Sequence, residues 1–212
     1  MRLVILGATG GIGQHVVGQA VTAGHEVVAV VRDPSVLTTR GDNLEVSTAD
    51  ALDSAALTPV LSGADAVISA LGVRPPVKGP VSLLANGATA ALKAMEAAGV
   101  TRFLMVSAAG AFPEAADGIG TRLLVKPLVG RVFRYSFDDT RVAEEIVRAS
   151  RVDWTIARPP RLTDDPRTGR YRVGDERGLK GAFTITRADV ADFLLRAVGD
   201  AATHRRAIVI AK

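Results

Sequence analysis

Short apolar runs alternate along the chain with segments in which apolar residues recur every three or four positions. The runs, which we predict to be strands, lie at residues 3–6, 27–31, 44–46, 66–69, 103–106, 154–157 and 207–210. The periodic segments, which we predict to be helices, lie at 12–23, 54–61, 82–98, 139–150 and 187–198. Strands that alternate with helices are typical of a parallel sheet covered on both faces. The pattern therefore predicts an α/β chain of 212 residues that forms one doubly wound, three-layer α/β/α domain of the Rossmann type.

Two segments rich in glycine and proline interrupt this alternation, at residues 108–137 and 158–186. Both follow the carboxyl end of a predicted strand, which is the edge where open α/β sheets bind ligands. Loops of this length inside a compact domain are usually functional. We therefore expect them to form the substrate side of a site, with a plain surface excursion as the alternative.

Composition narrows the chemistry. The chain has no cysteine and three dispersed histidines, so we expect no disulfide, no thiol catalysis and no metal site. The net charge of +4 comes from scattered arginines, which suits a cleft for a phosphorylated small ligand better than a nucleic-acid surface. The first apolar run is too short for a signal peptide or a membrane span. We expect a cytoplasmic monomer or homodimer with neither nucleic-acid nor membrane partners.

The clearest motif follows the first predicted strand, where glycines occupy positions 7, 10 and 13 before a helix. Gly7 permits a tight turn, Gly10 lets the backbone approach a pyrophosphate, and Gly13 lets the helix pack on the strand. The helix N-terminus then offers free N–H groups to an anion. The spacing is Gly-x-x-Gly-x-x-Gly, and it predicts a dinucleotide phosphate cradle.

The end of the second strand indicates which dinucleotide is bound. An acid there would bind the ribose 2′-hydroxyl of NAD, but this chain has Arg32, which suits the 2′-phosphate of NADPH. Asp33 precedes Pro34 and is expected to be an N-cap. The alternative for Arg32 is a solvated strand end.

Further positions lie where an extended dinucleotide would cross the sheet. Asp50-Ala51 follows the third strand and Ala70-Leu71-Gly72 follows the fourth. Small residues there would let a cofactor approach. For Asp50, a polar residue at a helix entry is an equally good interpretation.

These residues resemble the atypical short-chain dehydrogenase/reductase family. Within it, the chain resembles the NAD(P)-binding subgroup that contains biliverdin reductase B, a flavin reductase, and the NmrA-like sensor proteins. The matching features are Gly7-Ala8-Thr9-Gly10-x-x-Gly13, Ala23-Gly24-His25-Glu26-Val27, Val31-Arg32-Asp33, Val106-Ser107-Ala108, Trp154-Thr155-Ile156-Ala157-Arg158-Pro159-Pro160 and Thr168-Gly169-Arg170-Tyr171.

The resemblance implies which positions contact NADPH. In the glycine loop these are Gly7, Thr9, Gly10, Gly11, Ile12 and Gly13. At the ends of later strands they are Arg32, Asp50, Ala51, Ala70, Leu71, Gly72, Ser107, Pro159 and Pro160. Two positions depart from the flavin-reductase pattern. Arg161 stands where that pattern has a histidine, and Val36 where it has a basic residue, which bears on the substrate rather than the cofactor.

Most short-chain dehydrogenases use a Tyr-x-x-x-Lys pair for proton transfer, which here would fall at Ser136 and Thr140. Neither residue can replace the pair, so an ordinary alcohol dehydrogenase is not expected. Ser107 stands at the carboxyl end of the fifth strand, where the resemblance places the active-site serine. Its hydroxyl is the candidate catalytic group, bonding either the nicotinamide carboxamide or the carbonyl of a hydride acceptor. A serine that simply ends a strand is the alternative.

The sequence therefore favours an NADPH-dependent reductase of a flavin- or quinone-like acceptor that is planar and anionic. Basic and apolar residues at 120–134 suggest a flap over that acceptor, or an amphipathic surface helix. A noncatalytic NAD(P)-binding sensor of the NmrA-like type is the main alternative. An epimerase or dehydratase is a third, which the missing Tyr and Lys disfavour most.

Overall fold

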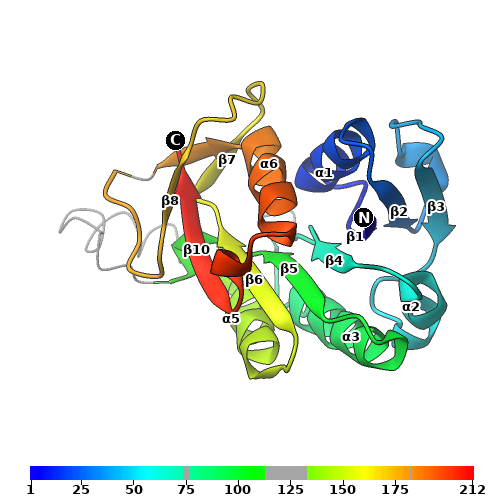
Figure 1. The fold of residues 1–212 in the computed structure, drawn as a ribbon. Coiled ribbons are helices and arrows are strands. Elements are labelled where there is room, and N and C mark those ends of the chain that lie inside the picture. The colour runs from blue at the N-terminus through cyan, green and yellow to red at the C-terminus, as the bar shows by residue number, and fades with distance from the viewer. Residues whose placement is uncertain (74–76, 113–132, 182) are drawn as a thin grey trace.

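The computed structural model describes residues 1–73, 77–112, 133–181 and 183–212. Eight strands form the main sheet in the order β3-β2-β1-β4-β5-β6-β10-β8 (Figure 1). The strands are β1 (Arg2–Leu6), β2 (Glu26–Val31), β3 (Leu44–Thr48), β4 (Ala66–Ser69), β5 (Arg102–Val106), β6 (Asp153–Arg158), β8 (Arg172–Gly174) and β10 (Arg206–Ala211). All paired neighbours are parallel except β8, which runs antiparallel to β10.

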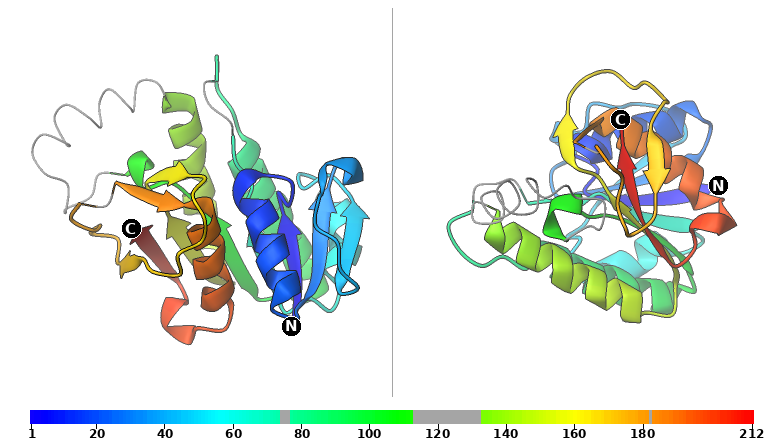
Figure 2. Two further views of the ribbon diagram at one scale, coloured as in Figure 1. Left: turned by 90° about the horizontal axis from the view of Figure 1, so that it is seen from above. Right: turned by 90° about the vertical axis from the view of Figure 1, so that its left-hand side faces the viewer.

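Helices cover both faces of this sheet (Figures 1 and 2). One face carries α1 (Gly11–Thr22) and α6 (Arg187–Val198), and the other carries α2 (Ser54–Leu61), α3 (Leu83–Ala98) and α5 (Arg134–Ala149). Short 3₁₀ turns are η1 (Pro34–Val36), η2 (Ala109–Ala111) and η4 (Ala201–Thr203). Successive residues of β1 alternate between the two cores, as a strand buried on both faces requires. The predicted Rossmann-type α/β/α fold is confirmed.

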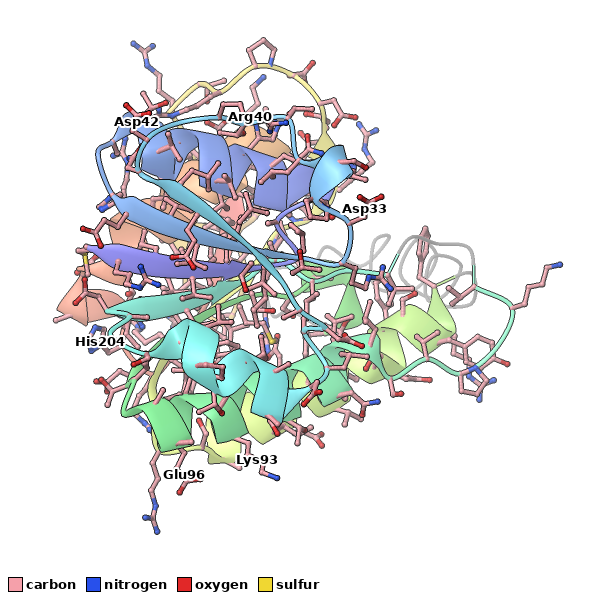
Figure 3. All side chains as sticks on the ribbon, turned by 90° about the vertical axis from the view of Figure 1, so that its right-hand side faces the viewer. Asp33, Arg40, Asp42, Lys93, Glu96 and His204 are labelled. Atoms are coloured by element: carbon pink, nitrogen blue, oxygen red, sulfur yellow. The ribbon has the colours of Figure 1, made fainter. Side chains whose placement is uncertain are left out.

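Strand order fixes the position of the site. The chain fills the sheet from β1 toward β3 and then returns to place β4 on the other side of β1. A ligand crevice forms where the order reverses, outside the carboxyl ends of the strands. Asp33, just after β2, and His204, just before β10, mark the carboxyl and amino edges of the sheet (Figure 3).

Glycines follow two of the helices and end them. Gly24 and Gly99 have φ angles of 78° and 72°, which L side chains rarely adopt. After α1, the N–H of His25 bonds the Ala20 carbonyl at 3.1 Å, and after α3 the N–H of Val100 bonds the Met95 carbonyl at 3.0 Å. Both bonds belong to the Schellman motif, which satisfies the last carbonyls of a helix.

The fourth predicted helix, at 139–150, begins five residues too late, because α5 starts at Arg134. The stacked rings of Phe133 and Phe137, whose centres lie 5.8 Å apart, flank its first turn. This apolar i,i+4 pair falls in the predicted insertion at 108–137 and not in the predicted helix. Asp139, in the second turn of α5, faces α3. Its two carboxylate oxygens accept the N–H groups of Leu84 and Ala85 at 2.9 and 3.0 Å. Asp139 therefore caps α3 from another helix.

The segment at 158–186 is more ordered than the predicted loop. It contains β8 and a separate two-stranded sheet, in which β7 (Arg161–Thr163) pairs in parallel with β9 (Thr184–Thr186). Asp189, buried in α6, accepts bonds from the N–H groups of Thr168 and Gly169, both at 2.8 Å. The segment is thereby fixed against α6. Of the other predicted insertion, at 108–137, residues 113–132 lie outside the described residues.

Candidate functional site

The turn between β1 and α1 has room only for glycine at two positions. Gly7 has a φ of 74°, and a Cβ there would lie 2.7 Å from the Ala70 carbonyl oxygen. A Cβ on Gly13 would lie 2.0 Å from the Gly7 carbonyl oxygen. These contacts bring the turn against the end of β4, so the predicted residues 7 and 70 do lie together.

The first turn of α1 presents unused hydrogen-bond donors. The helix begins with the N–H of Gln14 bonding the Gly10 carbonyl at 2.9 Å, and no side chain in the described residues caps it. The N–H groups of Gly11, Ile12 and Gly13 precede that bond and have no intrahelical acceptor. Gly10 is exposed at this end. Three free donors at a helix N-terminus fit the pyrophosphate of a dinucleotide.

Arg32 and Asp33 have the separate placements that the sequence predicts. The Asp33 carboxylate caps η1, accepting the N–H and hydroxyl of Ser35 at 2.9 and 2.7 Å, and these bonds lower the pKa of Asp33. Asp33 as the N-cap before Pro34 is confirmed. Arg32 is exposed, and no residue in the described part of the chain bonds its guanidinium. Its donors are therefore available to a ligand beside β2.

The other predicted contacts line the same edge. Asp50 is exposed and accepts the N–H of Leu52 at 3.0 Å, whereas Asp53 caps α2. Asp50 therefore stands in the turn that leads into α2, as the helix-entry interpretation expects, and its carboxylate does not cap that helix. The Leu71 side chain packs against α3, since a Cβ on Gly87 of that helix would lie 2.5 Å from Cδ1 of Leu71. Ala51 is partly buried and Gly72 is exposed.

Ser107 and Pro159 are brought together by backbone bonds that continue the pairing of β5 and β6. The N–H of Ser107 bonds the Ala157 carbonyl at 2.8 Å, and the N–H of Ala109 bonds the Pro159 carbonyl at 2.9 Å. Pro160 follows and is partly buried. In the sheet, Ser107 follows β5, two strands from the β1 that leads into the glycine turn, and the two prolines follow β6, three strands from it.

A buried ion pair holds the Ser107 side chain. Ser107 Oγ donates to Glu144 Oε1 at 2.5 Å. Arg158 donates to the same carboxylate through Nε at 2.9 Å and Nη2 at 2.6 Å. The Arg158 guanidinium lies 3.7 Å from the centre of the Phe112 ring. All three members of the cluster Ser107, Glu144 and Arg158 are buried.

This cluster restricts what Ser107 can do. With its hydrogen directed at Glu144, the hydroxyl presents only lone pairs to a neighbour. An amide N–H, such as that of a carboxamide, matches those lone pairs, whereas a carbonyl oxygen does not. Of the two expected partners of Ser107, the acceptor's carbonyl is therefore not served by this arrangement.

Sequence reasoning did not identify Glu144 or Arg158 as site residues, although a signal was present. Trp154 and Ile156 of β6 face the core beneath α5, and Arg158 continues that alternation onto the same face. A guanidinium buried there requires an acid from the covering helix. Glu144 on α5 supplies that acid.

The positions of the missing proton-transfer pair lie on α5. Thr140 donates its hydroxyl to the Ser136 carbonyl at 2.8 Å, and both side chains are buried. Neither of the two tyrosines in the chain is followed four residues later by lysine. Of the suggested 120–134 flap, residues 120–132 lie outside the described residues.

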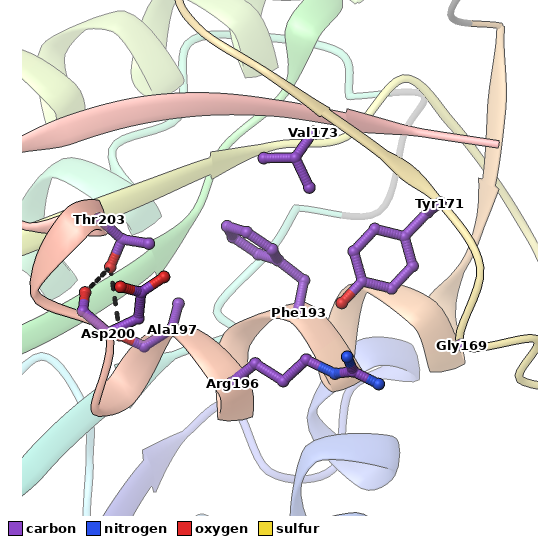
Figure 4. Close-up of a pocket in the computed structure, with 8 residues that line it drawn as sticks. All are labelled: Gly169, Tyr171, Val173, Phe193, Arg196, Ala197, Asp200 and Thr203. Carbon is purple, nitrogen blue, oxygen red and sulfur yellow. Dashed lines mark hydrogen bonds between the residues drawn. The ribbon is translucent and has the colours of Figure 1, made fainter.

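A separate cavity of about 300 Å³ lies between the 169–173 segment and α6 (Figure 4). Its lining includes Tyr171, Phe193 and Thr203. Thr203, which precedes β10, places one end of the cavity at the amino edge of the sheet, and the residues that line it include neither the glycine turn nor Ser107. The Tyr171 hydroxyl donates to Asp192 at 2.8 Å, and burial, followed by this bond, raises its pKa. This cavity does not belong to the site at the carboxyl edge.

The described residues contain no group of three or more His, Cys, Asp or Glu placed to hold a metal ion. None of the helices found there is long and apolar enough to cross a membrane.

Comparisons with known proteins agree with this geometry. The model of a family described as NAD(P)H-binding matches residues 7–201, which include the glycine turn, Ser107 and the start of α6. The uncharacterized sugar epimerase YhfK of Bacillus subtilis is 28% identical over 216 residues, covering 98% of this chain and 92% of that protein.

A second relative is named as a reductase. The (4-alkanoyl-5-oxo-2,5-dihydrofuran-3-yl)methyl phosphate reductase of Streptomyces griseus is 30% identical over 200 residues, covering 92% of this chain and 61% of that protein. Among solved structures, a wide-type short-chain dehydrogenase/reductase of Veillonella parvula in complex with NADP superposes with a TM-score of 0.78. It is 19% identical, with coverage of 100% of this chain and 94% of that one.

Proposed function

Because the chain belongs to the NAD(P)H-binding family, we propose that it is a reductase that binds NADPH and passes hydride to a flavin- or quinone-like acceptor. The observation on which this proposal rests is the hydrogen bonding of the Ser107 hydroxyl. Its hydroxyl hydrogen is held by Glu144, and Ser136 and Thr140 occupy the positions of the usual proton-transfer pair. The described residues of this site can orient a hydride donor, but they offer no proton for an alkoxide.

Each part of the site has a distinct task in this proposal. The free N–H groups at the start of α1 bind the pyrophosphate, and Arg32 binds the 2′-phosphate. Ser107 accepts an N–H of the carboxamide and thereby sets the orientation of the ring. The bound nicotinamide supplies the hydride. Glu144 and Arg158 act through Ser107 and are positioning residues.

The choice of acceptor follows from the lack of a proton donor in the part of the site that the structure describes. Ketones and aldehydes need a proton delivered to oxygen as hydride arrives. Reduced flavins and quinols can take their protons from water after hydride transfer. The Streptomyces griseus relative, named as a reductase, supports the reaction class. A planar, anionic acceptor remains our preferred substrate class, bound by a monomer or homodimer.

Turnover separates this proposal from a noncatalytic sensor, which the lack of a proton donor among the described residues also favours. We expect the purified protein to oxidise NADPH with flavin mononucleotide or menadione, and to act poorly on simple ketones and aldehydes. Ser107→Ala should lower kcat about 10-fold, equivalent to about 1.4 kcal/mol, because one orienting bond is lost. Tight NADPH binding without turnover on any flavin or quinone would establish the sensor instead. Rapid reduction of ketones would reveal a proton donor.

A further inference from the structure

The side chain of Arg187 lies across the start of α1, although it belongs to a different helix. A Cβ on Gly11 would lie 2.8 Å from both Cδ and Nε of Arg187. Since Cβ atoms tilt toward the N-terminus of a helix, the arginine occupies space on the open end of α1. Glycine at position 11 leaves the room that this side chain fills.

Two packing arrangements fix Arg187 there. The pairing of β7 with β9 aligns Thr163 with Thr186, so the next residues, Asp164 and Arg187, leave the small sheet together. Farther along α1, Gln19 Nε2 donates to the Ala188 carbonyl at 2.8 Å and ties the start of α6 to α1. The position of Arg187 therefore comes from strand register and helix docking.

The charge at this place is unfavourable unless an anion joins it. Arg187 is the first residue of α6, whose N-cap is Thr186, and its side chain reaches the N-terminus of α1 as well. A cation is disfavoured at each of these partially positive helix ends. Its one acceptor among the described residues is Asp164, at 2.5 Å from Nη1, and the Asp164 side chain is 85% exposed. An ion pair with so exposed a carboxylate contributes little, so an anion bound at this place can replace Asp164.

We propose that Arg187 binds the bridging phosphates of the dinucleotide and exchanges Asp164 for them when the cofactor enters. This inference rests on the proposed binding of NADPH at the glycine turn. The free N–H groups of Gly11 and Ile12 meet the phosphates from the helix end, and the guanidinium adds charge-assisted bonds from the side of α6. The 158–186 segment thus contributes to the cofactor site through β7 and β9.

The recognised group is the pyrophosphate and not the 2′-phosphate. Arg187 contacts the first turn of α1, whereas Arg32 stands at the end of β2. The two arginines are therefore assigned to different phosphates of one ligand. A change at Arg187 should therefore weaken only ligands that carry the pyrophosphate, and a change at Arg32 only ligands that carry the 2′-phosphate.

The test compares two arginine variants against two ligands. Arg187→Gln should raise the Kd of NADPH about 10-fold, the effect of a lost hydrogen bond to a charged group, and leave binding of adenosine 2′-monophosphate within about 2-fold. Arg32→Ala, the matched control, should weaken both ligands, because both carry the 2′-phosphate. Calorimetric titration gives Kd for NADPH, and displacement of NADPH fluorescence gives it for the monophosphate. Arg187→Lys should recover part of the loss.

Two further variants separate a direct contact from a packing effect. Asp164→Asn removes the competing carboxylate and should tighten NADPH about 2-fold. Gly11→Ala should displace the Arg187 side chain and weaken NADPH binding. The same change should weaken binding less when it is made in the Arg187→Gln variant, because the displaced guanidinium is already gone. Thermal unfolding of each variant controls for folding.

The outcomes are distinct. If the wild type binds NADPH and a folded Arg187→Gln variant has the same Kd, the assignment of Arg187 is wrong while the proposed function stands. Equal weakening of NADPH and adenosine 2′-monophosphate would also overturn it. If the wild type fails to bind NADPH, the proposed function fails and this inference fails with it.

Discussion

Glu144 accepts a hydrogen bond from Ser107 at 2.5 Å and also pairs with Arg158. One buried carboxylate therefore orients the Ser107 hydroxyl and holds the Arg158 side chain at the end of β6. The Glu144 side chain is 1% exposed and that of Arg158 is 6% exposed. Removing one member would leave an uncompensated charge in the core, which is more costly than removing both.

We therefore expect Glu144→Leu to lower the free energy of unfolding by about 3–5 kcal/mol. The double variant Glu144→Leu/Arg158→Met should lose less than Glu144→Leu alone, because no buried charge remains. Urea denaturation measures both. A double variant less stable than the single would show that the pair stabilises the fold by more than it costs to bury.

Asp139 should stabilise α3 across the helix interface. Asp139→Ala would leave the buried N–H groups of Leu84 and Ala85 without acceptors, and we expect a loss of about 2 kcal/mol. Ser82→Ala is the matched control, because Ser82 stands at the N-cap of α3 but its side chain makes no capping bond. It should change stability by less than about 0.5 kcal/mol. A larger loss of stability in Ser82→Ala than in Asp139→Ala would show that Ser82, and not Asp139, caps α3.

Asp189 predicts a specific acid sensitivity. Burial alone would raise its pKa, but bonds from Gly169 and Thr168 outweigh burial and hold the pKa below the ordinary 3.8. A carboxyl whose folded-state pKa is depressed stabilises the fold above its unfolded pKa, and the contribution is lost as pH falls through the folded value. The stability difference between the wild type and Asp189→Asn should thus be full at neutral pH and shrink below pH 3.8. A stability difference that stays constant from neutral pH down to about pH 2, well below the ordinary pKa of an aspartate, would contradict this prediction.

The glycines of the turn should differ in what they support. A Cβ on Gly13 would lie 2.0 Å from a backbone oxygen, so Gly13→Ala should prevent the folding of the β1–α1 unit. At Gly10 the nearest atom would be 3.2 Å away, which a small shift relieves. Gly10→Val should therefore fold but lose NADPH binding, since its branched side chain would meet the pyrophosphate. Circular dichroism tests folding and cofactor titration tests binding. Normal NADPH binding by a folded Gly10→Val variant would show that the glycine turn does not bind the pyrophosphate.

Local patterns were enough to predict much of this molecule. The glycine turn, the Asp33 cap, and the glycines that end α1 and α3 each follow from neighbouring residues. The order of predicted strands and helices gave the carboxyl edge as the place for the site. These features depend on backbone geometry that a short stretch of sequence fixes.

The features that were missed depend on contacts between distant segments. Asp139 meets Leu84 across 55 positions, and Ser107 meets Glu144 across 37. β8 is three residues long and pairs with β10 near the end of the chain. No local periodicity marks such contacts, because the partner exists only once the sheet is assembled.

The central claim is that the carboxyl edge binds NADPH with Arg32 on the 2′-phosphate, and calorimetric titration of NADPH and NADH tests it most directly. We predict that the wild type prefers NADPH. Arg32→Ala should lose about 1.5–3 kcal/mol of NADPH binding and little of NADH binding, the value of a hydrogen bond to a charged group. Equal losses for the two cofactors, or a wild type that prefers NADH, would contradict the account.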